Sequence, residues 1–256
     1  MKPQDIIAGK SSLWIFGYGS LVWKPDFKHK RSHVGFIRGY KRRFWHGDTF
    51  HRGSDEMPGR VVTLLEEDDA CTWGVAFEVT GSQIEESLTY LNIREAVRGG
   101  YGTRMVEFVP HDESQPSVQA LVYIATEDNP TYLGPASTDE IAAQIAVCKG
   151  KTGYNIEYLL RLAEFMRQSC PGVEDAHLFS IERACLAIFK PLLLAAQQRA
   201  VLLLPSTSVT ARSFASFGGG VKDVRAAVWE ELSAGAQDRA FSLGRGRAYG
   251  NERCGG

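Results

Sequence analysis

The sequence feature that most constrains the fold is an apolar run that breaks abruptly into glycine. Leu13 to Trp23 reads LWIFGYGSLVW, and the apolar run ends at Gly17-Tyr18-Gly19-Ser20. Such a run, ended by two glycines, predicts a buried strand followed by a tight turn, because glycine adopts positive φ without steric cost. A turn of this kind gathers backbone N–H groups at one spot, where they would form a cradle for a carboxylate or a developing oxyanion.

Two well-known glycine motifs are not satisfied at this turn. The dinucleotide-binding fingerprint requires a third glycine three residues after Gly19, where the sequence has Val22. The hydrolase nucleophile elbow requires glycines two residues on either side of the serine, and those positions are Tyr18 and Val22. Two interpretations stay open: a ligand cradle, and an ordinary strand-to-loop turn with Ser20 as a local hydrogen-bonding residue.

Composition narrows the classes of protein to which the chain can belong. Its 256 residues are 44% hydrophobic, which is enough to bury a full core. The 29 Lys and Arg residues nearly balance the 30 Asp and Glu residues, so the net charge would not attract nucleic acid or a membrane surface. The cysteines form no C-x-x-C pair and the N-terminus has no apolar signal core, which predicts a cytosolic protein. The longest apolar run, near Pro191 to Pro205, is shorter than the roughly 20 residues of a membrane span.

Alternation between apolar and polar residues predicts β-strands in the first half of the chain. Strands are predicted at 33–45, 60–65, 71–80, 101–109 and 117–125. The acidic residues 66–69 predict a turn that folds 71–80 back on 60–65 as a hairpin. Tyr123 lies within the last predicted strand, where it is either a core aromatic or a hydrogen-bond donor to a pocket.

From residue 82 onward the hydrophobic period becomes helical. Ser82-Gln83-Ile84-Glu85 is a capping box that predicts a helix from 83 to 96, ended by glycines. A second capping box at Ser137-Thr138-Asp139-Glu140 predicts a helix to about Lys149. Further helices are predicted at 155–168 and 174–189, and these helices are expected to cover the sheet.

The buried face of the helix predicted from residue 83 ends in a carboxylate. Ile84, Leu88 and Leu91 form an apolar stripe at i, i+4 and i+7, and the next position on that face is Glu95. Burial disfavours a charged carboxylate and raises its pKa toward neutrality, as a general base and acid near pH 7 requires. The alternative is a surface ion pair of Glu95 with a neighbouring arginine, and Arg94 itself is predicted to be a solvated charge.

Between Trp14 and Phe189 the sequence resembles the ChaC family of glutathione-specific γ-glutamylcyclotransferases, and within it the longer of two vertebrate paralogues. The motifs that carry the resemblance are IFGYGSLVW, RGYKRRFW, FHRG, PGRVVTL, WGVAF, YLNIREAVRGGY and NPTYLGPA. The resemblance implies an α+β fold with a mixed, barrel-like β-sheet and flanking helices. The predicted domains are a tail at 1–12, the cyclotransferase domain at 13–190, and a mostly irregular or disordered extension at 191–256.

The resemblance also implies the residues of the site. Glu95 is implied as the proton acceptor, and Tyr123 falls where related cyclotransferases have a pocket tyrosine. The turn is implied to bind the γ-glutamyl moiety of glutathione through Ile15, Phe16, Gly17, Tyr18, Gly19, Ser20 and Leu21. The expected protein is therefore a lyase that acts on a small molecule and uses no cofactor or metal. It is expected to bind no nucleic acid and to have no membrane span, and its protein partners are left open.

The expected reaction needs no water, because glutathione carries its own nucleophile. The α-amine of the γ-glutamyl group attacks the γ-carbonyl, giving 5-oxoproline and Cys-Gly, with Glu95 as general base and then general acid. The glycine carboxylate of the substrate is expected to meet one of four arginines that the sequence does not rank, Arg38, Arg42, Arg52 and Arg60.

Two rival interpretations stay open. One is a metal hydrolase built on His46, Asp48, His51 and Asp55, whose side chains are zinc ligands by type but match no helical ligand face. The other is a noncatalytic γ-glutamyl-binding or regulatory module that uses the same pocket. Burying Glu95 without chemistry would be costly, which counts against the second rival.

Overall fold

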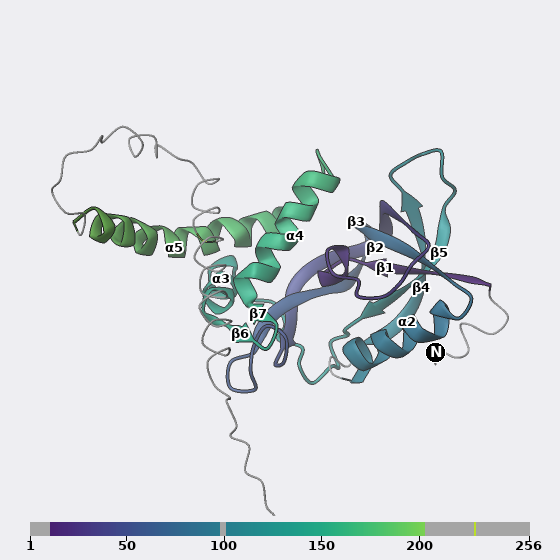
Figure 1. Cartoon of the computed structure of the whole chain (residues 1–256), viewed down its shortest axis with the longest axis horizontal. Coiled ribbons are helices and arrows are strands. Elements are labelled where there is room, and N and C mark those ends of the chain that lie inside the picture. The colour runs from purple at the N-terminus through teal and green to yellow at the C-terminus, as the bar shows by residue number, and fades with distance from the viewer. Residues whose placement is uncertain (1–10, 98–100, 203–227, 229–256) are drawn as a thin grey trace, which may run out of the picture. The chain divides into compact units, whose positions relative to one another are not determined.

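The computed structural model describes residues 11–97, 101–202 and 228, except for the side chains at 95–97 and 192–202. The chain divides into two compact units, Met1–Cys185 and Leu186–Gly256, and the first holds the strands and the candidate site (Figure 1). Most of the predicted tail and extension lies outside the described residues, so the proposed domain boundaries stay predictions. Over the described ranges, no helix has both the length and the apolar character needed to cross a membrane.

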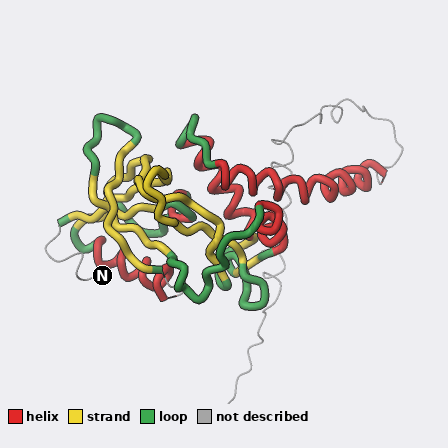
Figure 2. The backbone as a smooth tube through the Cα atoms, turned by 180° about the vertical axis from the view of Figure 1, so that it is seen from behind, coloured by secondary structure: helices red, strands yellow, loops and turns green. Residues whose placement is uncertain are grey.

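Five strands close into a barrel in the order β1-β3-β2-β4-β5, shown in yellow in Figure 2. Their bounds are β1 Ser12–Gly17, β2 Arg31–Asp48, β3 Gly59–Thr80, β4 Gly102–Pro110 and β5 Val118–Ile124. The first strand closes the barrel, because β1 pairs antiparallel with β3 on one side and parallel with β5 on the other. This mixed barrel with flanking helices confirms the predicted fold class.

The pairing of β2 with β3 corrects one sequence prediction. The segments 60–65 and 71–80 are not partners in a hairpin but parts of the single strand β3, and both pair with β2. Arg38 of β2 pairs with Cys71 of β3, but Tyr40, two residues later, pairs with Glu66. The residues of β3 between these two pairs, most of them acidic, therefore bulge out of the ladder. Charged side chains reach water at a bulge without ending the strand, which is why the acidic run looked like a turn.

The helix α2, Gln83–Leu91, packs its apolar stripe on the barrel. Ile84, Leu88 and Leu91 are all buried in one core cluster with residues of β1 and β5, and each such side chain contributes roughly 1.5–3 kcal/mol by leaving water. The predicted capping box at its start is wrong. Ser82 already has helical φ and ψ, and its side chain makes no capping hydrogen bond.

The segment that follows α2 is a turn of π-helix, η2, from Asn92 to Val97. A π-helix bonds residue i to i+5 and is rare, occurring mostly as a single turn and often at functional sites. The helix predicted to reach residue 96 is therefore confirmed in extent but not in type, because α-helical periodicity stops at Leu91.

Three further helices and a small hairpin complete the described fold: α3 Thr138–Val147, β6 Lys149–Gly150, β7 Gly153–Tyr154, α4 Asn155–Ser169 and α5 Ala176–Leu202. The capping box at Ser137 is confirmed, since its hydroxyl accepts the Glu140 N–H and the Glu140 carboxylate accepts the Ser137 N–H. The prediction that the last helix ends at Phe189 is wrong. α5 continues through Pro191, because the leucines and alanines beyond it are strong helix formers.

Candidate functional site

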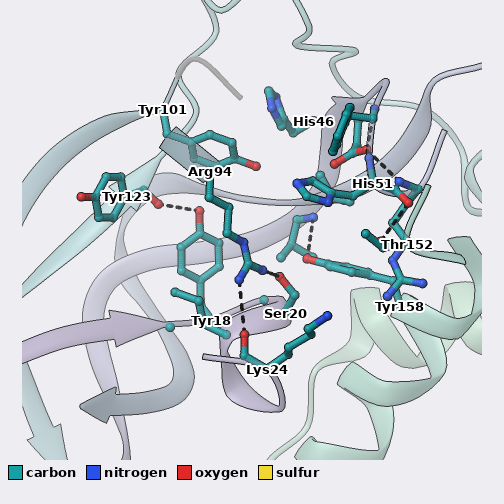
Figure 3. A pocket seen from close by; sticks show the side chains of 18 of the residues that line it. Tyr18, Ser20, Lys24, His46, His51, Arg94, Tyr101, Tyr123, Thr152 and Tyr158 are labelled. Atoms are coloured by element: carbon teal, nitrogen blue, oxygen red, sulfur yellow. Dashed lines mark hydrogen bonds between the residues drawn. The ribbon is translucent and has the colours of Figure 1, made fainter. Parts of the chain in front are cut away.

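A cavity of about 390 Å³ opens where the glycine turn, the end of β2 and α4 meet (Figure 3). Of the residues predicted to bind the γ-glutamyl group, Phe16 to Leu21 and Tyr123 line this cavity. Ile15 does not, because its side chain is fully buried in the core cluster beneath α2. The structure therefore brings most of the predicted binding residues to one place.

The glycine turn is built on close packing rather than on unusual backbone angles. The positive φ predicted for Gly17 and Gly19 is wrong, since neither is among the glycines that adopt it. A Cβ atom added to Gly19 would lie 2.6 Å from the Tyr158 hydroxyl, and one added to Gly17 would lie 2.6 Å from the Leu21 Cβ. Any side chain at these two positions would collide with its neighbours, so glycine is needed there for space.

A short 3₁₀ helix, η1 (Ser20–Val22), follows the turn and leaves backbone donors at its start. Its first hydrogen bonds run from the Val22 N–H to the Gly19 carbonyl and from the Trp23 N–H to the Ser20 carbonyl. The N–H groups of Ser20 and Leu21 precede these bonds and have no acceptor within the helix. Both residues line the cavity, where such donors suit an anionic group.

Two tyrosines connect the turn to β5 and to η2. The Tyr18 hydroxyl donates to the Tyr123 carbonyl at 2.8 Å, and the Tyr123 hydroxyl donates to Asn92 Oδ1 at 3.0 Å. Tyr123 is 4% exposed, belongs to the core cluster and also lines the cavity. Tyr123 is therefore a core aromatic, as one alternative expected, that also borders the cavity, while a role for its hydroxyl in binding a ligand stays a prediction.

Arg94 is a site residue that the sequence interpretation placed wrongly. Instead of being a solvated charge, it lines the cavity and donates from Nη2 to Ser20 Oγ at 2.5 Å and from Nη1 to the Lys24 carbonyl at 3.3 Å (Figure 3). The α-helical count that pointed Arg94 outward fails because Arg94 lies in the π turn. Its place within the YLNIREAVRGGY motif was the signal that could have found it.

Glu95 follows Arg94 within η2, and its side chain lies outside the described part of the structure. The stripe that assigned Glu95 to the apolar face assumed α-helical spacing, and that spacing ends at Leu91. The stripe argument therefore no longer supports the assignment. The role of Glu95 as a general base stays a prediction that rests on the motif.

The cavity distinguishes among the four arginines that the sequence left unranked. Arg42 and Arg60 are buried but do not line the cavity. Arg42 donates hydrogen bonds to Asp175 and to two backbone carbonyls, and Arg60 donates to Gln144 and to two backbone carbonyls. Arg38 is exposed and lies over the Phe36 ring. Of the four, Arg52 alone lines the cavity.

Arg52 shares a carboxylate with Arg161, which the sequence analysis did not single out. Glu157 Oε2 accepts from Arg52 Nη1 at 2.8 Å, and Glu157 Oε1 accepts from Arg161 Nε at 2.9 Å. Burial acts to raise the pKa of Glu157, but these two bonds outweigh it and hold that pKa below its usual value. Two guanidinium groups therefore flank one ionised carboxylate on this wall of the cavity. The i, i+4 spacing of Glu157 and Arg161 was the sequence signal for this pair.

Three of the four residues named in the rival metal-hydrolase interpretation, His46, Asp48 and His51, have other contacts in the structure. Asp48 Oδ1 accepts the backbone N–H groups of Phe50, His51 and Arg52, so it fixes the loop after β2. His46 is buried against the Tyr101 ring and, like His51, lines the cavity. Among the residues that the structure describes, no three His, Cys, Asp or Glu side chains are grouped so as to hold a metal ion.

Comparison with known proteins relates this arrangement to one family. The model of the ChaC-like protein family matches residues 13–187. A relative from Danio rerio named glutathione-specific γ-glutamylcyclotransferase 1 is 81% identical over 196 residues, which are 77% of this chain and 100% of the relative. The relative of the same name from Homo sapiens is 61% identical, over 66% of this chain and 77% of its own. A crystal structure of the glutathione-specific cyclotransferase from yeast is 30% identical, with a TM-score of 0.61, and covers 68% of this chain and 98% of its own.

Proposed function

The chain belongs to the ChaC-like family, and we propose that it is a glutathione-specific γ-glutamylcyclotransferase that converts glutathione to 5-oxoproline and Cys-Gly. The observation that carries this proposal is that the glycine turn, Tyr123 and η2 meet around one cavity, in a chain whose relatives bear the name of this activity. The cysteines support a cytosolic setting, because Cys71, Cys148, Cys170 and Cys185 are free thiols, as expected in a reducing compartment.

The turn binds the γ-glutamyl group through its backbone. The N–H groups of Ser20 and Leu21 face an anionic part of the substrate, and the glycines let the substrate approach the main chain closely. Arg94 and Tyr18 hold the turn from either side, through Ser20 Oγ and the Tyr123 carbonyl respectively. The donors are thus fixed before the substrate arrives, so little reorganisation accompanies the reaction.

Within this cradle the substrate reacts with itself. The α-amine nitrogen bonds to the γ-carbonyl carbon, a five-membered ring closes, and the bond from that carbon to the cysteine nitrogen breaks. Holding the tripeptide folded places the amine and carbonyl in reacting geometry, an effect of up to about 7–11 kcal/mol. Water takes no part, and neither does a covalent intermediate with the protein.

Glu95 moves the proton that this reaction requires. It takes one proton from the substrate ammonium before attack and delivers it to the departing nitrogen as the tetrahedral intermediate collapses; the ring nitrogen loses a second proton as it becomes an amide, and that proton ends on the amine of Cys-Gly. Two contacts of its neighbours in η2 support this role: Arg94 reaches Ser20 of the turn, and Asn92 accepts from Tyr123. The segment that carries Glu95 is therefore tied to the cavity on both sides.

Release of 5-oxoproline from glutathione tests the proposal. The substitution Glu95→Gln keeps the shape of the side chain but not its basicity, and we expect turnover to fall by about 10²–10⁴ with the fold intact. Glu86→Gln, on the exposed face of α2, is the matched control and should leave turnover unchanged. Glutathione that binds to the wild-type protein but is not cleaved would favour a noncatalytic binding module instead. Near wild-type release of Cys-Gly by Glu95→Gln would overturn the role of that residue.

A further inference from the structure

A buried ion pair lies behind the glycine turn. Arg42 of β2 is 4% exposed and does not line the cavity, and Asp175 Oδ2 accepts from its Nε at 2.9 Å and from its Nη2 at 2.7 Å. Burial acts to raise the pKa of Asp175, but the charge of Arg42 and the Leu178 N–H outweigh it and hold that pKa below its usual value. Well-packed hydrophobic residues often stabilise a core as well as a buried ion pair does, so stability alone is a weak reason for this one.

The other donors of Arg42 reach the backbone of the turn. Nη1 donates to the Tyr18 carbonyl at 2.9 Å and to the Trp73 carbonyl at 3.2 Å. Nη2 also donates to Met166 Sδ at 3.1 Å. Together with the two bonds to Asp175, these bonds engage as many N–H groups as a guanidinium has, which is five. The guanidinium is thus fixed in one orientation, with Nη1 directed at the turn.

Through the Tyr18 carbonyl, Arg42 orients a whole peptide group of the turn. The Tyr18 carbonyl and the Gly19 N–H belong to one planar peptide unit, in which they point in opposite directions. Tyr18 and Gly19 both line the cavity, whereas the guanidinium that holds the carbonyl does not. Fixing the carbonyl on the buried side therefore directs the Gly19 N–H away from Arg42.

Gly19 is the residue of the turn that most needs such an anchor. A glycine has the widest choice of φ and ψ of any residue, so its backbone is the easiest to misdirect. Its two peptide groups are held separately: Arg42 binds the Tyr18 carbonyl, and the Val22 N–H donates to the Gly19 carbonyl at 3.1 Å. The Ser20 N–H shares a peptide group with the Gly19 carbonyl, so the direction of the cavity donors depends on both anchors.

We propose that Arg42, held by Asp175, is a positioning residue that fixes the glycine turn, so that the backbone donors of the turn meet the γ-glutamyl group in the correct direction. This inference rests on the proposed function and deepens it, since it concerns how the same cavity holds its substrate. Arg42 does not touch the reacting atoms and acts through the Tyr18 carbonyl. Its loss therefore weakens binding of the γ-glutamyl part of the substrate and not of the Cys-Gly part.

The test measures binding of the two products separately, because 5-oxoproline is the former γ-glutamyl group and Cys-Gly is the rest of the substrate. Arg42→Lys keeps a positive charge beside Asp175 but lacks the planar fork of a guanidinium. By titration calorimetry we expect Kd for 5-oxoproline to rise about 10-fold and Kd for Cys-Gly to change less than about twofold. We expect kcat/KM for glutathione to fall by about 10- to 100-fold, because a displaced turn costs reacting geometry.

A second variant reaches Arg42 from its other side. Asp175 Oδ1 accepts the Leu178 N–H in the first turn of α5, and asparagine is an equally good helix cap, so Asp175→Asn serves if Arg42→Lys folds poorly. Its NH₂ group meets the guanidinium where Oδ2 accepted two bonds. Arg42 then loses its anchor, and Kd for 5-oxoproline should rise while Kd for Cys-Gly stays unchanged.

Glu182→Gln is the matched control. It removes the charge of another buried carboxylate, which is bonded to Arg167 and does not line the cavity. We expect this variant to be less stable in urea but to keep the wild-type Kd for 5-oxoproline. If Glu182→Gln weakened 5-oxoproline binding as much as Asp175→Asn, the effect would be general damage to the fold and the proposal would be overturned.

The remaining outcomes separate this inference from the proposed function. A folded Arg42→Lys protein that binds 5-oxoproline as tightly as the wild-type protein, or that weakens both products equally, would refute the positioning role and leave the cyclotransferase activity in place. A wild-type protein that binds 5-oxoproline but releases none from glutathione would refute the activity. Weaker binding of 5-oxoproline alone by Arg42→Lys would then still support the role of Arg42 in holding the turn.

Discussion

At the scale of single residues, Gly19 shows how the site depends on space. The Tyr158 hydroxyl and Val62 Cγ2 lie 2.6 Å and 3.0 Å from the position that a Cβ atom would occupy, and the Tyr158 side chain is buried. The sequence marked this glycine correctly as a feature of the turn. The partner that makes it necessary comes from α4, more than a hundred residues away, and local sequence contains no sign of it.

We predict that Gly19→Ala destabilises the protein by about 1–3 kcal/mol through overpacking and lowers glutathione turnover by displacing the turn. Gly102→Ala is the matched control, because a Cβ there would meet only the Ile124 carbonyl oxygen at 3.9 Å. Urea unfolding measures the first effect and 5-oxoproline release the second. In a Tyr158→Phe background, which removes the colliding oxygen, the same substitution should cost less; an equal cost would contradict this explanation.

His177 illustrates a half-buried group that links stability to pH. Its Nε2 accepts the Phe44 backbone N–H at 3.0 Å. Burial first, and then the positive charge of Arg43, lower its pKa from 6.5 to about 4, although the Asp175 carboxylate acts in the opposite direction. Between pH 6.5 and 4 the imidazole binds a proton in the unfolded chain but not in the folded chain, so the free energy of unfolding falls as the pH drops from 6.5 toward 4.

We predict that His177→Gln weakens this dependence on pH. Glutamine supplies an oxygen that accepts the Phe44 N–H but does not titrate, so the free energy of unfolding should decrease less between pH 6.5 and 4 than in the wild-type protein. Urea unfolding at several pH values in the window measures the slope. Identical slopes for the two proteins would show that His177 does not carry the effect.

At the scale of elements, sequence pattern could predict where strands and helices lie but not how they are joined. The apolar stripe of α2 and the capping box at Ser137 were found correctly, because both depend on local spacing. The bulge at 67–70 was mistaken for part of a turn, because only the pairing with β2 distinguishes a bulge from a turn. The π turn at Asn92–Val97 was missed for a similar reason, since it changes which side chains share a face without any local signal.

The π turn, η2, matters because the hydrogen bond from Arg94 to Ser20 Oγ connects it to η1. We predict that Arg94→Gln and Ser20→Ala are not additive in their effects on kcat/KM, with a coupling energy of about 0.5–3 kcal/mol. A double-mutant cycle measures this coupling. Additive effects would mean that the contact does not position the turn, and a loss in Ser20→Ala as large as that in Glu95→Gln would mean that the hydroxyl has a chemical role.

At the scale of the whole molecule, the chain is longer than the part of it that matches known relatives. The described cavity residues run from Phe16 to Arg161, within the first compact unit. The family model ends at residue 187, and the Danio rerio relative matches along its whole length although 23% of this chain has no counterpart in that match. The closed barrel and the described residues that line the cavity therefore all precede the part of the chain that the family model leaves unmatched.

We predict that a chain ending at residue 202, the last residue of α5, keeps kcat/KM for glutathione within about twofold of the full chain. No described residue beyond Arg161 lines the cavity, so removing 203–256 takes away none of its described donors or walls. Release of 5-oxoproline by the two proteins at equal concentration measures this, and thermal unfolding confirms that the shortened protein is folded. A folded but inactive shortened protein would contradict the prediction, because it would mean that the extension supplies part of the site.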